Sequence, residues 1–426
     1  MNLFDVYREL PTPPAGKIVL IVFDGLGGLP REPGGPTELE AAATPNLDAL
    51  AADGSCGLLD NVLPGVTPGS GPAHLGLFGY DPLVYDIGRG LLSALGIGFP
   101  VEVGDLCARI NFCTLHPDTD IVLDRRAGRI PTDESGPLVE LLGEIQIPGC
   151  EIFIESVKEH RACVVFRAPD LYDDIDDTDP QTVWEDTPLA IEARQARSEK
   201  AAGLVADFAR QATEKLKARF APMADALRGP RAQVEAFIAE NHPANGILLR
   251  GFARYEKLPH LGEVFGIRSA AIATYPMYRG VASLVGMAVL DDAGETIADE
   301  FACLEKHFDQ YDLFFLHIKK TDSYGEDGNW DRKVHVIEEG DAQIPRARAL
   351  GPAVVCVTAD HSTPCVLKAH SWHPVPVVLW SKWGRRDGVE AFGETACACG
   401  GLGRQRGIHL MPMLVAHALG FGKYGA

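Results

Sequence analysis

Three short runs of uninterrupted aliphatic residues are the strongest pattern in the sequence. They cover residues 17–23 (KIVLIVF), 313–318 (LFFLHI) and 353–357 (AVVCV). Such runs are typical of parallel strands that are buried on both faces of a sheet. Residues 269–274 predict another strand, and 298–309 predict a helix that leads into the second run in a βαβ rhythm. The chain is therefore expected to be an α/β protein with a mostly parallel sheet flanked by helices.

A stretch of different character separates the first of these runs from the other two. Its strand-like pieces are short, and one helical pattern extends from residue 192 to 219. Apolar side chains recur there every four residues: Leu204, Phe208, Ala212 and Leu216. We expect an inserted α+β domain within a core that is built from two parts of the chain. The expected ranges are 1–104 for the first core part, 105–262 for the insertion and 263–426 for the second core part.

Within the insertion, residues 170–187 are unusually rich in aspartate. This composition predicts a polar loop on the surface. The alternative is that residues 177–180 (DTDP) turn toward a functional site.

The composition excludes several classes of protein. The 426 residues include 39 Lys and Arg against 59 Asp and Glu, which gives a formal net charge of −20, and so acidic a chain is not expected to bind nucleic acid. The first residues lack the basic and apolar regions of a signal peptide, and no apolar run is long enough to span a bilayer. We therefore expect a cytoplasmic protein without a membrane partner; its oligomeric state is not predicted. The 10 cysteines contain no CxxC pair and are expected to be mostly buried small hydrophobic residues.

Each of the three aliphatic runs is followed closely by an aspartate: Asp24, Asp322 and Asp360. Because the carboxyl ends of parallel strands share one edge of a sheet, these carboxylates are expected to lie together. His361 and His370 follow the third run and would add imidazole nitrogens to the group. Such a mixed nitrogen and oxygen donor set suits zinc, manganese or cobalt.

A serine in a sharp turn is the candidate nucleophile. In the segment PGSGPAHL, residues 68–75, glycines and prolines place Ser70 at the start of a short helix. There its hydroxyl would lie near backbone N–H groups and the positive end of the helix, which suit an attacking oxygen and a phosphate. The alternative is an ordinary helix cap. His74, four residues later on the same helical face, would either orient a phosphate or pack beneath the turn.

Arginines in the insertion are the candidate anion-binding residues. Arg125, Arg126 and Arg129 lie within five positions, and Arg250 adjoins an aliphatic run. Guanidinium groups bind carboxylate and phosphate in a bidentate manner, and an arginine beside buried residues needs an anionic partner. The alternative for the first three is a solvated basic turn. Lys319 is a candidate of second rank.

Seven motifs spread over nearly the whole chain give it a resemblance to a known family. They are VFDGLGG from Val22, TPNLDALAADG from Thr44, PGSGPAHLGLFGYDP from Pro68, DRRAGRI from Asp124, ILLRG from Ile247, KKTDSYGEDG from Lys319 and TADHSTPCVLKAHS from Thr358. Together they resemble the cofactor-independent phosphoglycerate mutases of the alkaline phosphatase superfamily, in particular the archaeal-type branch. The resemblance implies an alkaline-phosphatase-like sheet and the interconversion of 3-phosphoglycerate and 2-phosphoglycerate in glycolysis and gluconeogenesis.

The resemblance also implies roles for single residues. Ser70 would be the nucleophile that becomes phosphorylated. The ligands of two divalent metal ions would be Asp24, Ser70, Asp360 and His361 for one, and Asp322 and His370 for the other. The ions would be manganese, zinc or cobalt, with magnesium as a further candidate. The inserted domain would act as a lid that carries arginines and excludes water.

One position departs from the pattern of the resembled family. A histidine is expected four residues after Asp322, where this chain has Glu326. A glutamate oxygen can replace the imidazole and would favour harder metals such as manganese. Alternatively Glu326 is a solvated charge, and His373 or His317 fills the gap. Two other functions stay open: a phosphatase or phosphonate hydrolase with the same metal core, and a phosphometabolite-binding protein that has lost catalysis.

Overall fold

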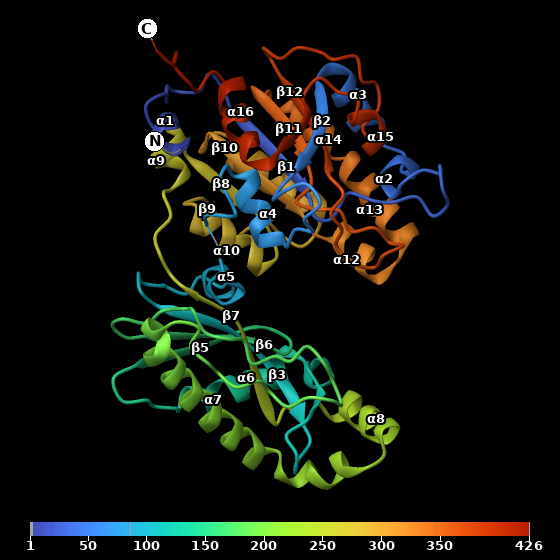
Figure 1. The fold of residues 1–426 in the computed structure, drawn as a ribbon. Helices are drawn as coiled ribbons and strands as arrows, with labels where there is room; N and C mark the ends of the chain where they lie inside the picture. The colour runs from blue at the N-terminus through green and yellow to red at the C-terminus, as the bar shows by residue number, and fades with distance from the viewer. Residues whose placement is uncertain (1–2, 86, 426) are drawn as a thin grey trace. The chain divides into compact units, whose positions relative to one another are not determined.

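The computed structural model describes residues 3–85 and 87–425, which form two compact units (Figure 1). The core unit consists of Met1–Asp86 and Leu258–Ala426, and the inserted unit is Ile87–Lys257. The first boundary lies before the position 104 expected from the sequence, because helix α5 (Arg89–Gly96) packs on strands of the inserted unit. Gly90 allows this close approach, since a Cβ atom there would lie 2.4 Å from the Cα atom of Ala108.

The core unit is built on a sheet of eight strands in the order β13-β2-β12-β11-β1-β10-β8-β9. In that order the strands are Gly403–Arg406, Ser55–Asp60, Val375–Ser381, Val354–Thr358, Ile18–Phe23, Leu313–Ile318, Ser269–Ile272 and Ala288–Val289. Only β12 runs antiparallel to its neighbours, so the mostly parallel α/β sheet expected from the sequence is confirmed. The three aliphatic runs form the central strands β1, β10 and β11, and every residue in them is buried.

The core unit also contains helices between the strands of this sheet and at the ends of the chain. They are α1 (Leu3–Tyr7), α2 (Glu38–Ala41), α3 (Pro45–Asp53), α4 (Ser70–Leu77), α9 (Leu261–Phe265), α10 (Pro276–Leu284), α11 (Ile297–His307), α12 (Lys320–Asp327), α13 (Trp330–Asp341), α14 (Ile344–Ala349), α15 (Glu394–Cys397) and α16 (Leu410–His417). Helix α11 precedes β10, as the sequence predicts. Among the described residues, no helix combines the length and apolar character needed to cross a bilayer.

The inserted unit has its own sheet, with the order β4-β3-β6-β5 and β7 paired to β3. These strands are β3 (Leu106–Leu115), β4 (Val122–Asp124), β5 (Glu151–Lys158), β6 (Arg161–Arg167) and β7 (Gly246–Arg254), and the remaining helices are α6 (Thr132–Gly143), α7 (Glu199–Arg219) and α8 (Arg231–Asn241). One sheet face packs in a hydrophobic core with Phe208, Ala212 and Leu216 of α7. Helix α7 begins at Glu199 rather than 192 because Ala193 is extended and forms a β-bridge with Ile175.

The sequence predicts a surface loop over the aspartate-rich segment 170–187. The structure shows that only part of this segment lies on the surface. Leu171, Ile175, Thr178 and Asp179 are buried. Thr178 continues the edge of β7: its backbone N–H donates to the carbonyl of Leu249, and its hydroxyl accepts from the Leu249 N–H at 2.7 Å. Apolar and hydrogen-bonding residues between the aspartates thus pull the segment inward.

The start of helix α3 depends on a residue from a distant helix. Thr44 precedes the helix at the capping position, but its side chain makes no capping hydrogen bond. Instead Asp341 of α13, which is buried, accepts hydrogen bonds from the backbone N–H groups of Asn46 and Leu47 at 3.0 and 2.7 Å. A carboxylate at this end of the helix also interacts favourably with the helix dipole.

We predict that Asp341→Ala lowers the free energy of unfolding by about 2–3 kcal/mol, because partly or fully buried backbone donors lose their acceptor. Thr44→Ala is the matched control and is expected to cost less than about 1 kcal/mol. Urea denaturation followed by circular dichroism measures both. A larger loss for Thr44→Ala than for Asp341→Ala would contradict this assignment of the cap.

Candidate active site

The three strand-end aspartates converge at one edge of the core sheet. Strands β1, β10 and β11 pair in register, with Val22 opposite both His317 and Thr358, so their carboxyl ends lie level. Asp24 and Asp360 are completely buried and Asp322 is 4% exposed. The backbone N–H of Gly25 donates to Asp360 Oδ1 at 3.0 Å, which links the loops after β1 and β11. The convergence predicted from the sequence is therefore present.

The first cluster at this edge contains Asp24, Asp360, His361 and Ser70. His361 Nε2 lies 3.4 Å from Asp24 Oδ1, 3.1 Å from Asp360 Oδ2 and 3.2 Å from Ser70 Oγ. Both of these carboxylate oxygens are buried, and neither has a hydrogen-bond partner among the described residues. Four side chains from three segments of the chain thus direct polar atoms at one small volume.

A hydrogen-bond chain fixes which nitrogen of His361 faces that volume. The hydroxyl of Thr363 donates to Asp322 Oδ1 at 2.8 Å, so its oxygen accepts from the Nδ1–H of His361 at 3.0 Å. In the neutral imidazole Nε2 is then unprotonated and offers a lone pair. A lone pair facing two carboxylate oxygens that lack donors is unfavourable without a cation. The residues present therefore fit a divalent metal ion.

The second cluster contains Asp322, His361 and His370, whose ligand atoms lie within 4.8 Å of one another. The carbonyl of Pro68 accepts from His370 Nδ1 at 2.9 Å, which leaves Nε2 to face Asp322 Oδ1 at 3.5 Å. In neutral His370 the lone pair of Nε2 therefore faces a carboxylate, as it does in His361. The rings of His361 and His370 stack with their centroids 3.6 Å apart.

Glu326 lies at the rim of the second cluster. Its carboxylate is exposed, and Oε1 is 4.0 Å from His370 Nε2. The alternatives raised by the sequence lie elsewhere. His373 hydrogen-bonds through Nδ1 to the hydroxyl of Ser371, and His317 is completely buried and stacks on Tyr278. Neither belongs to a group of potential metal ligands within the described chain.

Ser70 begins helix α4 as the sequence predicts, and the turn before it is tied to the metal-binding edge by the bond from His370 to Pro68. Within the helix His74 donates from Nδ1 to the carbonyl of Ser70 at 2.8 Å. The His74 ring is completely buried against Tyr278 and Phe315. This is the packing role of the two that the sequence leaves open.

The buried carboxylates differ in their affinity for protons. Burial and the negative charge of Asp360 raise the pKa of Asp24 well above its ordinary value. Burial also acts on Asp322, but in the metal-free protein a protonated His370, which then donates from Nε2, and the charge of Lys319 outweigh burial and lower the pKa of Asp322. Similarly, the imidazoles of His361 and His74 outweigh burial and lower the pKa of Asp360. Without metal, the cluster therefore favours a proton on Asp24.

Lys319 contacts the carboxylates themselves. Its Nζ lies 2.9 Å from Asp24 Oδ2 and 2.5 Å from Asp322 Oδ2. Burial opposes its charge, but these two carboxylates prevail and raise the pKa of the ammonium above its ordinary value. The ammonium thus joins the ends of β1 and β10.

The arginines of the inserted unit fall into two groups. Arg125 binds Asp179 in a bidentate manner, at 2.8 and 2.7 Å, and Arg250 approaches the same carboxylate at 3.1 Å. Arg250 therefore has the anionic partner that its position required. Arg126 and Arg129 are exposed, and within the described chain their side chains have no carboxylate partner.

The pKa of buried His160 is sensitive to the charges of Arg126 and Arg129. Burial lowers the pKa of its imidazole first, and the charges of Arg161, Arg126, Arg109 and Arg129 lower it further, to about 3. The DRRAGRI turn places Arg126 and Arg129 on either side of Ala127 and Gly128, with positive φ angles of 45°, 66° and 62° at residues 127–129. The positive charges of four arginines thus reach His160 in this part of the inserted unit.

Comparison with known proteins identifies the family. The family model for 2,3-bisphosphoglycerate-independent phosphoglycerate mutase matches residues 51–220. A probable 2,3-bisphosphoglycerate-independent phosphoglycerate mutase from Thermus thermophilus is 46% identical over 100% of both chains, and one from Aquifex aeolicus is 46% identical over 99% of this chain and 100% of its own. The chain belongs to the family of 2,3-bisphosphoglycerate-independent phosphoglycerate mutases. The resemblance carried by the motifs is confirmed.

Solved structures agree with this phosphoglycerate mutase family. The PH0037 protein from Pyrococcus horikoshii superposes with a TM-score of 0.79 and is 29% identical, covering 96% of this chain and 99% of its own. A cofactor-independent phosphoglycerate mutase from Thermoplasma acidophilum has a TM-score of 0.68 and 29% identity, covering 95% of this chain and 100% of its own.

Several residues of this mutase site escape detection in the sequence. The hydroxyl of Tyr278 donates to Asp24 Oδ2, and Thr363 connects Asp322 with His361. Thr363 could have been noticed, because it follows His361 by two residues in the ADHSTP segment. No local signal marks Tyr278, since it lies on α10, far along the chain from Asp24.

Lys333 of α13 is the other residue that the sequence does not reveal. Its side chain is completely buried, and Nζ donates to the carbonyls of Gly27 at 3.1 Å and Thr363 at 2.9 Å. These two residues lie on the loops after β1 and β11. Buried Glu38 accepts from the backbone N–H groups of Leu29 and Cys365 on the same loops. A pair of opposite buried charges therefore holds both ligand-bearing loops.

We predict that Thr363→Val weakens binding of Mn²⁺ to the metal-stripped protein by about 10–100-fold, because the ring orientation and tautomer of His361 are no longer fixed. Thr358→Val is the matched control: this buried hydroxyl donates to the carbonyl of Pro376 and contacts no potential ligand. Calorimetric titration measures both affinities. Equal weakening by the two substitutions would show that Thr363 does not orient the ligands.

Proposed function

We propose that this chain interconverts 3-phosphoglycerate and 2-phosphoglycerate through a phosphorylated Ser70 and without a bisphosphoglycerate cofactor. Membership of the phosphoglycerate mutase family supports this function, which serves glycolysis and gluconeogenesis. The observation that carries it is the position of Ser70: Oγ lies 3.2 Å from His361 Nε2, which also faces the buried oxygens Asp24 Oδ1 and Asp360 Oδ2, neither of which has a hydrogen-bond partner among the described residues. The hydroxyl thus lies where cations held by these carboxylates would activate it as a nucleophile and would bind a phosphate.

Two divalent metal ions fit the donor set. Asp24, Asp360, His361 and Ser70 would hold one ion, and Asp322 and His370 the other, with Glu326 as a further ligand from the rim. When bound, such ions lower the proton affinity of the serine hydroxyl and neutralise charge on a phosphoryl group. Manganese, zinc and cobalt suit these nitrogen and oxygen donors, and magnesium suits the carboxylates alone.

Ser70 carries the phosphoryl group between two positions of the same glycerate. A bond from Ser70 Oγ to phosphorus forms as the ester bond of the substrate breaks, and the other glycerate hydroxyl then attacks the phosphoserine and restores Ser70. Lys319 supports this exchange because its ammonium pairs with Asp24 and Asp322 while its side chain is 22% exposed, so that the same ammonium can also bind the phosphate.

We infer that Arg126 and Arg129 bind the anionic groups of the substrate more directly than Arg125 and Arg250 do. Two observations support this ranking: Arg126 and Arg129 are exposed and free of carboxylates within the described chain, whereas Asp179 already neutralises the other pair. Arg125 and Arg250 then hold the segment of Asp179 beside β7, and they would bind the substrate only by exchanging Asp179 for one of its anionic groups.

The nucleophile is tested with metal-stripped protein and 3-phosphoglycerate. With manganese, zinc, cobalt or magnesium restored singly, we expect 2-phosphoglycerate to form without free phosphate. Ser70→Ala should abolish this conversion, while Ser55→Ala, whose hydroxyl donates to the carbonyl of Arg385, should retain it. Free phosphate as the main product would favour a phosphatase, and binding without turnover would favour a phosphometabolite-binding protein; either result would overturn the proposal.

The anion-binding residues are tested by the double substitution Arg126→Ala and Arg129→Ala. Loss of two charged hydrogen-bonding groups should reduce kcat/KM for 3-phosphoglycerate by about 10²-fold or more, at about 1.5–3 kcal/mol for each group. The matched control is Arg210→Ala, which removes an exposed guanidinium of α7 that pairs with Asp207 and Glu214. A double variant with the same kcat/KM as the control would contradict this role.

A further inference from the structure

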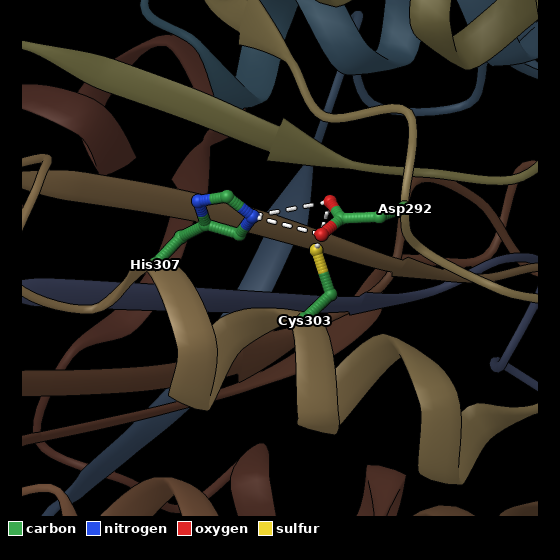
Figure 2. Close-up of side chains that lie close together, drawn as sticks. All are labelled: Asp292, Cys303 and His307. Atoms are coloured by element: carbon green, nitrogen blue, oxygen red, sulfur yellow. Dashed lines mark hydrogen bonds and ion pairs between the residues drawn. The ribbon is translucent and has the colours of Figure 1, made fainter.

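Another group of metal-ligating side chains lies in the core unit and shares no residue with the two clusters described above. Asp292 follows the edge strand β9, and Cys303 and His307 are one turn apart on α11. Figure 2 shows the three side chains directed toward one another. His307 Nε2 lies 3.1 and 3.0 Å from the two carboxylate oxygens of Asp292, and Cys303 Sγ lies 3.4 Å from Asp292 Oδ1.

Local structure holds this group in place. Residues four apart on a helix share one face, so Cys303 and His307 present their ligand atoms side by side. A capping box between Thr296 and Asp299 fixes the start of α11, and Gly294, with φ of 70°, turns the chain from Asp292 back toward the helix. The Cys303 side chain is only 3% exposed, whereas Asp292 and His307 reach the surface.

We propose that Asp292, Cys303 and His307 bind a zinc ion, with a water molecule as the fourth ligand. Tetrahedral zinc with bonds of about 2.0–2.3 Å places its ligand atoms roughly 3.3–3.6 Å apart. The separations of 3.0 and 3.4 Å found here are close to these values. A thiolate beside an imidazole and a carboxylate selects zinc over magnesium or calcium, which prefer oxygen ligands.

Charge balance supports zinc at this position. Binding replaces the thiol proton, which passes to the solvent, and the charges of the thiolate and Asp292 then balance that of Zn²⁺. Lys306 now pairs with Asp292 at 2.5 Å, but its side chain is 66% exposed and can turn into water.

A zinc ion here would link helix α11 to the loop that follows β9, a short strand at one edge of the core sheet. Strand β9 has only two residues and pairs with β8 alone. The Asp292 carboxylate already receives hydrogen bonds from Cys303, Lys306 and His307 across this edge. An ion bound only by the folded chain would add to this link by mass action.

The test uses the full-length, metal-stripped protein titrated with Co²⁺ as a spectroscopic substitute for zinc. A cobalt–thiolate charge-transfer band is expected from Cys303, and Zn²⁺ should displace it. This readout separates the site from the active-site clusters, which contain no cysteine. It is also independent of the proposed mutase activity, so failure of one proposal leaves the other intact.

Four variants decide the outcome. Cys303→Ser should abolish the band, His307→Gln should weaken zinc binding at this site by about tenfold or more, and Cys399→Ser, which removes an exposed cysteine, should leave the band unchanged. Lys306→Met should strengthen zinc binding, because the competing ammonium is gone. Circular dichroism checks that each variant folds, and Cys303→Ala replaces Cys303→Ser if the latter does not.

Two results would overturn the proposal. The first is the absence of a thiolate band in the unsubstituted protein, which would mean that Asp292 is only the anchor of an ion-pair network. The second is a band that survives in Cys303→Ser, which would place the thiolate ligand elsewhere. Under the ion-pair reading, Lys306→Met would lower the thermal stability without affecting zinc affinity.

Discussion

The site depends on one constraint: buried carboxylate oxygens that accept no hydrogen bond within the described chain lie close together at the carboxyl edge of the core sheet. Asp24 Oδ1 and Asp360 Oδ2 are buried without hydrogen-bond partners among the described residues, and His361 Nε2 faces both. Burial makes their mutual repulsion strong because water does not screen it. Other interactions hold the loops in this arrangement, and a proton on Asp24, the ammonium of Lys319 or metal ions must offset the negative charge.

The parallel sheet makes the crowding possible. Central strands that are buried on both faces have little freedom to slip in register, so the residues that follow them arrive at one level. The loop that leads from β11 to the antiparallel strand β12 carries His370 to the same edge. His370 donates to the carbonyl of Pro68 and so holds the turn before Ser70 at this edge. Ser70, the proposed nucleophile, is thus positioned by a hydrogen bond between segments that are far apart in the sequence.

Sequence patterns predict what local chemistry determines. Aliphatic runs gave the central strands, and the residues after them gave Asp24, Asp322 and Asp360. What the patterns miss depends on partners distant in the chain: Asp341 rather than Thr44 caps α3, Lys333 ties two loops, and Thr178 joins the edge of β7. Nothing local distinguishes these residues from ordinary surface polar groups. The tautomers of His361 and His370 were equally hidden, because Thr363 and Pro68 fix them only in the folded chain.

In the proposed function, the inserted unit supplies the positive charge with which a chain of net charge −20 attracts an anion. Charge counting alone overstates its supply of arginines, because Asp179 neutralises part of the charge of Arg125 and Arg250. Arg126 and Arg129 remain, and an exposed guanidinium binds weakly by itself because solvent and salt screen it. Several must therefore act on one ligand at once; the charges of Arg126 and Arg129 both add to the effect of burial in lowering the pKa of His160. A small ligand with two anionic groups satisfies this condition better than a single phosphate does.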